Sequence, residues 1–395
     1  MKSLRRNWPI WSRLMNPSIT DKLKTNAQHY SAQFLVDALF VVTLALLCFG
    51  LTMVYSASAV SAFGRYKNDT YFLQRQALFV GLGLLGMRLV QTVPLNFIRQ
   101  AMRFLWLLGI MSLLLVLVPG LGRVANGARR WFTFLPLQPA EFAKILVILL
   151  MAHALAKKET FKQTRYIWLS AFAAQSIIIL VLLEPDFGTA AVLQFLVIMM
   201  LYLGGARLGK VFAIILALIP VGVYLVQKSP YRMRRLHAFL DPFSDRLGAG
   251  YQLAEALMSI GSGGFFGEGL GDSKQKLYFV PEAHTDFIFA IIGEELGFLG
   301  VSLLIILFLS FLFLGYQLAM KHEDPFARYV TLGICFWIVS QAGLNMAVST
   351  GLVPTKGLTL PLISYGGSSL LSCCLGIGLM FSAAHPLLRN AGSRR

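Results

Sequence analysis

The sequence predicts an all-α integral membrane protein with about ten transmembrane helices and a large extracytoplasmic loop between helices 7 and 8. Of its 395 residues, 56% are hydrophobic and only 13% are charged. The mean hydropathy of +0.67 excludes an ordinary soluble domain. Apolar stretches of about 20 residues, long enough to cross the ~30 Å hydrocarbon core as helices, recur along the chain. The positions of Lys and Arg between these stretches give the orientation.

The apolar stretches define the expected helices in chain order. They lie at roughly 33–55, 73–95, 101–120, 140–157, 166–183, 187–205, 209–227, 286–319, 327–350 and 361–388. The first begins too late and is too long for a cleaved signal peptide, so we expect a retained signal anchor. We expect a cytoplasmic N-terminal tail (1–32), a polytopic membrane domain (33–389) with its loop at about 228–285, and a cytoplasmic C-terminal tail (390–395).

An even number of helices places both termini on one side, and the positive-inside rule makes that side cytoplasmic. Many of the outward-facing cations then cluster in the short loop with Arg123, Arg129 and Arg130 and in the long segment 228–285. A long loop is exempt from the rule, and Arg near a helix end can reach the headgroups. The alternative is an anionic ligand, most plausibly a phosphate-bearing lipid. Charge alone favours neither explanation.

The long loop 228–285 is the only segment large enough to fold outside the bilayer. Residues 251–260 predict a short amphipathic helix, and a run of glycines follows from Gly261 to Gly271. The glycines resemble a phosphate-binding loop only loosely, because no strand precedes them and no Lys-Ser/Thr pair closes the motif. Loop flexibility is favoured over ligand contact.

An unusual share of the acidic residues falls in PEAHTDFIFAIIGEELG, residues 281–297. Asp286 stands where the chain re-enters the membrane, and there a helix cap and a chemical role explain it equally well. Glu294 lies about 12 Å deeper at 1.5 Å per residue, and the adjacent Glu295 lies on a different face. Carboxylates at that depth are expensive, so they are usually paired or functional.

Two further pairs of charged residues lie at expected helix ends. Glu141 and Lys144 are three residues apart on one helix face, where an ordinary ion pair is slightly favoured. Glu184 and Asp186 lie at another outer helix end, where capping explains at least one of them.

The last two expected helices carry polar and small residues. Gln341, Asn345 and Ser349 form a stripe at i, i+4 and i+8, for which interhelical hydrogen bonding is the simplest purpose. LPLISYGGSS, residues 360–369, opens the tenth stretch, where small residues permit close helix contact.

The expected topology brings several of these groups to one outer face: Asp286, Arg130, Lys144, the Glu184/Asp186 loop and the Lys356 loop. A cavity there would combine one candidate base with several cations. That combination fits chemistry on a diphosphate-linked lipid.

Five motifs carry a resemblance to a known family: NGARRWF with QPAEFAK, LEPDFGTA, GSGGFFGEGLG, VPEAHTDFIFAIIGEELG and PLISYGGSS. In this order they resemble the shape, elongation, division and sporulation (SEDS) family of bacterial cell-wall polymerases, along essentially the whole membrane portion. Because it carries the Thr355–Lys356 pair, the chain resembles the division branch of this family rather than the elongation branch. The resemblance implies ten transmembrane helices and polymerisation of lipid II on the outer face of the membrane.

The resemblance also implies residue roles. The C4 hydroxyl of an acceptor lipid II would attack C1 of the donor sugar chain, and undecaprenyl diphosphate would leave with inversion. Asp286 would be the catalytic base, its pKa raised by partial desolvation, and Arg130 and Lys144 would stabilise the leaving diphosphate. We further expect substrate contacts from Glu141, Lys356 and Ser368, and structural or secondary roles for Glu294, Glu184, Asp186 and Asn345.

The expected partners are lipid II, a class B penicillin-binding protein, other division-complex membrane proteins and membrane lipid, and no nucleic acid. The expected location is the bacterial cytoplasmic (inner) membrane at the division septum. No cofactor is expected with certainty; a divalent cation, Mg²⁺ or Mn²⁺, stays open, because the six His offer no metal-ligand spacing. The four Cys fall in membrane spans and indicate neither a disulfide nor a catalytic thiol.

Two other functions would also use buried carboxylates or a polytopic membrane domain. A lipid II flippase would use Glu294 and Glu295 as proton-coupling groups, but Asp286 and most outward cations lie at one face only. A non-catalytic scaffold that recruits division proteins would not need Asp286 at all.

Overall fold

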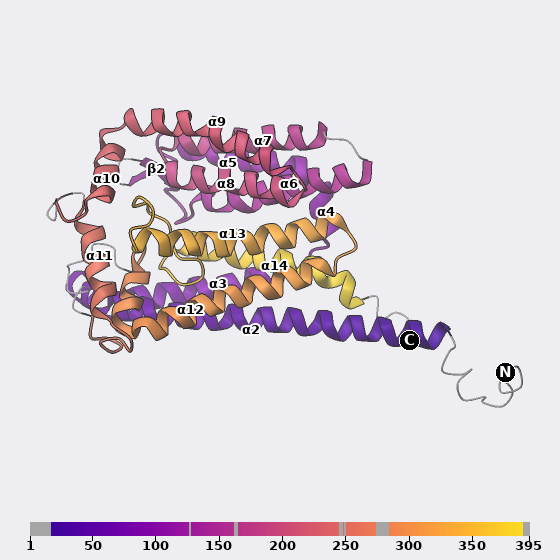
Figure 1. Ribbon diagram of the computed structural model, residues 1–395, viewed down its shortest axis with the longest axis horizontal. Helices are drawn as coiled ribbons and strands as arrows, with labels where there is room; N and C mark the ends of the chain where they lie inside the picture. Colours follow the sequence, from indigo (N-terminus) through magenta and orange to yellow (C-terminus); the bar gives the residue numbers. More distant parts are fainter. Residues whose placement is uncertain are drawn as a thin grey trace, which may run out of the picture.

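The computed structural model describes residues 17–125, 128–161, 165–244, 248, 250–273 and 284–389. These residues form a helical bundle with nearly parallel long helices (Figure 1). Its helices are α2 (Pro17–Tyr66), α3 (Tyr71–Thr92), α4 (Leu95–Gln100), α5 (Met102–Leu117), α6 (Pro139–Phe161), α7 (Arg165–Leu183), α8 (Phe187–Leu203), α9 (Leu208–Gln227), α10 (Pro230–Leu240), α11 (Tyr251–Ser262), α12 (Ile288–Met320), α13 (Pro325–Ser349) and α14 (Gly367–Arg389).

The all-α membrane fold class is confirmed. Each expected span coincides largely with a helix: α2, α3, α5 to α9, and α12 to α14. Among the described residues, seven helices are long and apolar enough to cross a membrane by length and composition, and α5 and α8 are shorter apolar helices. The expected helix at 251–260 is also present, as α11.

Two boundaries differ from the expectation. The first helix extends to Pro17–Tyr66, so part of the expected N-terminal tail is helical; residues 1–16 and the expected C-terminal tail, 390–395, lie outside the described residues. The last helix begins at Gly367 rather than near 361, and residues 351–366 are not helical. Pro354 and Pro361 interrupt this apolar segment, because proline has no N–H to donate within a helix.

Burial separates central from peripheral helices. Within their apolar windows, 78% of α6, 72% of α14 and 61% of α13 is buried, whereas none of α9 is. α13 packs against α6, α12 and α14, so it joins the two halves of the bundle seen in Figure 1. α9 lies at the edge and packs mainly on α8 and α10.

One end of the bundle carries short elements that connect the long helices. There lie α10, α11 and an antiparallel hairpin of β1 (Gly122–Ala125) and β2 (Ala128–Phe132), opposite the start of α2 and the end of α14 (Figure 1). We call this the loop end. The hairpin was not expected from the sequence, because it is too short to show a period-two pattern.

The glycine run packs against a break in α12. Gly297 has φ 62° and ψ −158°, and the flanking backbone bonds to the run: Glu268 N donates to Glu294 O (2.9 Å), and Phe298 N donates to Gly264 O (3.0 Å). A Cβ on Gly267 would stand 2.2 Å from Glu295 O. For these residues the expectation of loop flexibility was wrong, because the glycines permit close backbone packing.

Candidate functional site

Asp286 lies just before α12 at the loop end. Its backbone oxygen accepts a hydrogen bond from Asn345 Nδ2 of α13 (2.9 Å). Its half-buried carboxylate faces the backbone of Gly357, where an added Cβ would stand 2.9 Å from Asp286 Oδ2. The N-cap residue of α12 is Phe287, so Asp286 does not occupy the capping position that the sequence left open.

The polar stripe of α13 binds the backbone of Asp286 and the segment before α14. Asn345 Nδ2 also donates to Leu358 O (2.6 Å), and Gln341 Nε2 donates to Thr359 O (3.0 Å). These bonds run from a helix to non-helical backbone. The expected interhelical bonding describes only part of the stripe's role.

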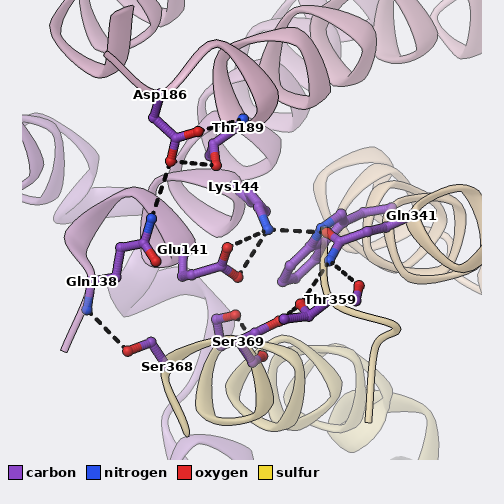
Figure 2. Close-up of polar contacts among 11 residues, drawn as sticks. Gln138, Glu141, Lys144, Asp186, Thr189, Gln341, Thr359, Ser368 and Ser369 are labelled. Atoms are coloured by element: carbon purple, nitrogen blue, oxygen red, sulfur yellow. Dashed lines mark hydrogen bonds and ion pairs between the residues drawn. The ribbon is translucent and has the colours of Figure 1, made fainter. Parts of the chain in front are cut away.

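Lys144 lies at the centre of the cluster drawn in Figure 2. Its Nζ donates to both Glu141 carboxylate oxygens (2.9 Å each) and to Gln341 Oε1 (3.0 Å), which also accepts from Trp337 Nε1 (3.0 Å). The ion pair that the spacing predicts is confirmed. Lys144 has 0% exposure, so its three donor protons serve neighbours within the protein. A direct substrate contact by Lys144 stays a prediction, and this geometry favours a positioning role.

Asp186 caps α8, as capping predicted for one member of its pair. It accepts from Thr189 N (3.1 Å), Thr189 Oγ1 (2.9 Å) and Gln138 Nε2 (3.1 Å), as Figure 2 shows. Gln138 precedes α6, so this residue links the Asp186 cap to the helix that carries Lys144. Arg130 Nε lies 3.8 Å from Asp186 Oδ2.

The two arginines of β2 have different partners. Arg130 Nη2 donates to Pro185 O (2.6 Å), so its side chain reaches the loop between α7 and α8. Arg129 Nη1 donates instead to Leu117 O at the end of α5 (3.3 Å). Only Arg130 therefore joins the cluster around Asp186.

Glu184 is buried without a hydrogen bond from any described residue to either carboxylate oxygen. Burial, reinforced by the Asp186 charge and opposed by Arg130, raises the pKa of Glu184 from 4.5 to about 8. Near neutral pH this side chain is therefore largely protonated.

Lys356 and Ser368 contribute in different ways. Lys356 Nζ stands 5.0 Å from the centroid of the Phe187 ring, and burial lowers the pKa of Lys356 against the opposing effect of Asp186. The buried Ser368 hydroxyl accepts from Gln138 N (2.9 Å) and donates to Pro136 O (3.3 Å). These bonds anchor the entry to α6, and a substrate contact by Ser368 stays a prediction.

Glu294 and Glu295 bind serine hydroxyls. Ser259 (2.8 Å) and Ser273 (2.6 Å) donate to Glu294 Oε2, and Ser56 donates to both oxygens of Glu295 (2.7 and 2.6 Å). The first carboxylate ties α12 to α11 and the segment after it, and the second ties α12 to α2. This arrangement favours the structural role expected for Glu294.

Several site residues were missed because their partners are distant in sequence. Gln138, Thr359 and Ser369 complete the hydrogen-bonded cluster of Figure 2, where the Thr359 and Ser369 hydroxyls lie 2.7 Å apart. Of these three residues, only Gln138 could have been suspected from the sequence, because it lies three residues before Glu141. Within the described residues, no group of three or more His, Cys, Asp or Glu side chains could hold a metal ion.

Known proteins match this chain along most of its length. The profile of the FtsW/RodA/SpoVE family, described as cell cycle protein, matches residues 37–387. The probable peptidoglycan glycosyltransferase FtsW of Trichlorobacter lovleyi is 42% identical over 353 residues, covering 87% of this chain and 91% of that protein. The stage V sporulation protein E of Bacillus subtilis is 38% identical over 356 residues, covering 88% and 96%.

Solved structures share the fold. A chain from a structure described as "Structural coordination of polymerization and crosslinking by a peptidoglycan synthase complex" is similar, with a TM-score of 0.72, 31% identity, and coverage of 89% of this chain and 98% of that chain. The rod shape determining protein RodA of Thermus thermophilus is similar with a TM-score of 0.64, 30% identity and coverage of 88% and 95%.

Proposed function

The chain belongs to the FtsW, RodA and SpoVE family of cell cycle proteins and is a peptidoglycan glycosyltransferase, and we propose that it polymerises lipid II into glycan strands at the outer face of the cytoplasmic membrane. The loop end then faces outward, and both termini are cytoplasmic. The relatives named FtsW and the Thr355–Lys356 pair support a role in septal wall synthesis.

The observation that carries this proposal is the position of Asp286. Its carboxylate is half-buried against Gly357, next in the chain to Lys356, and the α13 face that binds its backbone also binds Lys144 through Gln341. A candidate base and several cations are thereby fixed at one end of the bundle. Sugar transfer from a diphosphate donor uses a base to take the proton of the attacking hydroxyl and cations to stabilise the leaving diphosphate.

The proposed mechanism uses these groups in turn. The C4 hydroxyl of an acceptor lipid II attacks C1 of the donor glycan as Asp286 takes its proton. The C1–O bond breaks with inversion, and undecaprenyl diphosphate leaves with the electron pair. Arg130, at the rim of the site, stabilises the leaving diphosphate, and Lys144 fixes Glu141 and Gln341 from below.

We propose a class B penicillin-binding protein as the membrane partner. A similar solved chain comes from what its description calls a peptidoglycan synthase complex that coordinates polymerization and crosslinking, at 31% identity. Other division-complex proteins would bring this pair to the septum. The N-terminal residues 1–16 receive no role in this proposal.

The flippase alternative receives less support from the buried carboxylates. Glu294 and Glu295 each accept hydrogen bonds from serine hydroxyls, and Glu294 serves contacts between α12 and the α11 segment. Proton coupling requires groups that change partners between the two faces of the membrane. These bonds instead favour fixed structural links.

Replacement of Asp286 tests the proposal. We expect Asp286→Asn to abolish glycan polymerisation while leaving membrane insertion and partner binding intact, because Asn keeps the size of the side chain but cannot take the proton. The measurement is glycan chain length from labelled lipid II with purified protein and its transpeptidase partner. Asp241→Asn, in the exposed turn after α10, is the matched control and should polymerise normally.

The same assay separates the alternatives. Lipid translocation without chains would support the flippase, and neither activity would support a scaffold. Chains formed by Asp286→Asn at a near wild-type rate would eliminate the general-base assignment.

A further inference from the structure

Three successive backbone carbonyls that lead into α12 each accept a hydrogen bond from a residue far away in the sequence. They are His284 O from Tyr365 N (2.9 Å), Thr285 O from Ser364 Oγ (2.6 Å) and Asp286 O from Asn345 Nδ2 (2.9 Å). Two of the three donors belong to residues 360–365, the turn just before α14. This turn therefore holds the backbone that carries the candidate base.

Ser364 is the centre of the turn, because its hydroxyl and its backbone both bridge separate segments. The hydroxyl donates to Thr285 O and accepts from Leu360 N (2.8 Å). The Ser364 carbonyl accepts from Gln76 Nε2 of α3 (3.1 Å). Since a backbone N–H can only donate, the single hydroxyl proton of Ser364 is left for the Thr285 carbonyl. With 3% exposure, this serine makes its bonds away from solvent.

The turn keeps its shape despite an unfavourable backbone conformation. Leu362 has φ 65°, in the left-handed region that residues other than glycine rarely adopt, and it is 2% exposed. Such a conformation persists only where the surrounding structure holds it. Here α2 packs against the turn at Gly50, where an added Cβ would stand 2.7 Å from both Ile363 Cα and Leu362 O. Together with the bond from α3, this packing makes the turn a rigid support.

The segment that contains the turn also reaches the Asp286 carboxylate. Gly357 lies against Asp286 Oδ2, and Lys356 is the residue before it. One stretch of chain, residues 356–365, thus carries a cation, backs the carboxylate and binds the backbone beside it. A general base must come within about 2.6–3.2 Å of the atom whose proton it takes. A displacement of about 1 Å can slow a reaction by about 10²-fold.

We propose that Ser364 is a positioning residue for Asp286: its hydroxyl fixes the Thr285 carbonyl and, with it, the place of the catalytic carboxylate relative to Lys356. This inference rests on the proposed function, because it takes Asp286 as the general base. Ser364 acts through the backbone next to the base and is not itself a catalytic residue. Its own proton stays on the bond to Thr285 O throughout the reaction.

Removal of the hydroxyl tests the proposal. Ser364→Ala removes the donor to Thr285 O, and Ser364→Cys keeps a side chain of similar size with a weaker donor. The matched control is Ser382→Ala, because Ser382 is also 3% exposed and also donates to a distant backbone carbonyl, Val93 O (2.5 Å), towards the opposite end of α14. The measurements are the melting temperature of each full-length variant, and its kcat and KM for glycan synthesis from labelled lipid II with the transpeptidase partner.

We expect Ser364→Ala to lower kcat about tenfold with KM nearly unchanged, because the substrate still binds while the base is displaced. The kcat of Ser364→Cys should lie between those of the wild type and Ser364→Ala. Ser382→Ala should lower the melting temperature by a similar amount but keep the wild-type kcat. This control separates a loss of stability from a loss of alignment at the base.

A wild-type kcat in folded Ser364→Ala would overturn the proposal. So would a loss confined to KM, or an equal loss of kcat in Ser382→Ala. If Ser364→Ala does not fold, the same criteria apply to Ser364→Cys. A wild-type kcat in Ser364→Ala together with an inactive Asp286→Asn would reject the role of Ser364 and retain the proposed function, whereas polymerisation by Asp286→Asn would reject the general base itself.

Discussion

At the scale of single residues, Arg129 and Arg130 show how adjacent identical side chains acquire different roles. Arg130 contacts the Asp186 loop, whereas Arg129 binds the end of α5. We expect Arg130→Ala to slow polymerisation by about 10²-fold, because it removes a cation from the leaving-group side of the site. Arg129→Ala should have a much smaller effect.

Replacement of Arg130 by lysine gives a second test of its role. Arg130→Lys should restore only part of the rate, since Lys keeps the charge but loses the planar, bidentate group. The assay is the initial rate of glycan synthesis at saturating labelled lipid II. Equal rates for the two alanine variants would refute the distinction between the arginines.

Glu184 gives a prediction about pH at the same scale. Burial raises its pKa from 4.5 to about 8 in the folded protein, so the folded state retains a proton that the unfolded chain releases in this range. The contribution of Glu184 to the free energy of unfolding should therefore fall as pH rises from about 4.5 to 8. One pKa unit corresponds to about 1.4 kcal/mol, so the effect is measurable.

The measurement is the melting temperature in detergent between pH 5 and pH 8. Glu184→Gln, which has no proton to release, should flatten the fall seen in the wild type and melt at a similar or higher temperature at pH 8. Glu255→Gln on α11, a less buried site, is the control and should keep the wild-type slope. An unchanged slope in Glu184→Gln would assign the pH dependence to other groups.

At the scale of elements, Glu294 and the glycines both join α12 to α11 and the segment after it. Glu294 Oε2 accepts hydrogen bonds from the hydroxyls of Ser259 and Ser273, and each such bond contributes about 1 kcal/mol to stability. We expect Glu294→Gln to stay folded and partly active at low temperature, with a lower melting temperature. Glu255→Gln serves again as the control. A fully stable but wholly inactive Glu294→Gln would move this residue into the chemical site.

The elements also show what the sequence could predict. Hydrophobic length predicted the membrane helices, and local spacing predicted α11, the Glu141–Lys144 pair and the Asp186 cap, because each depends on neighbours within a few residues. The β1–β2 hairpin and the bonds from Gln341 and Asn345 to residues 358 and 359 were missed. Such partners are set by the packing of distant segments, which a single sequence does not reveal.

At the scale of the whole molecule, α13 organises the candidate site. It packs against α6, α12 and α14, and its polar face reaches Lys144, Asp286 and the segment before α14. The sequence predicted one outer face for Asp286, Arg130, Lys144, Glu184, Asp186 and Lys356 from topology alone. The structure shows contacts between Arg130 and Asp186, and from α13 to both Lys144 and Asp286. Which of these side chains contact one another follows only from the folded structure.

The exposed position of α9 has a consequence for how the enzyme meets its substrate. The proposed substrate is a lipid held in the same bilayer as α9, of whose apolar window none is buried in the protein, so it arrives at the site from the membrane rather than from the aqueous phase. Lipid substrates reach such a site by two-dimensional diffusion, so the relevant concentration is the number of molecules per unit area of membrane. Inert phospholipid added at constant total substrate slows such an enzyme by surface dilution, whereas added buffer leaves its rate per molecule unchanged.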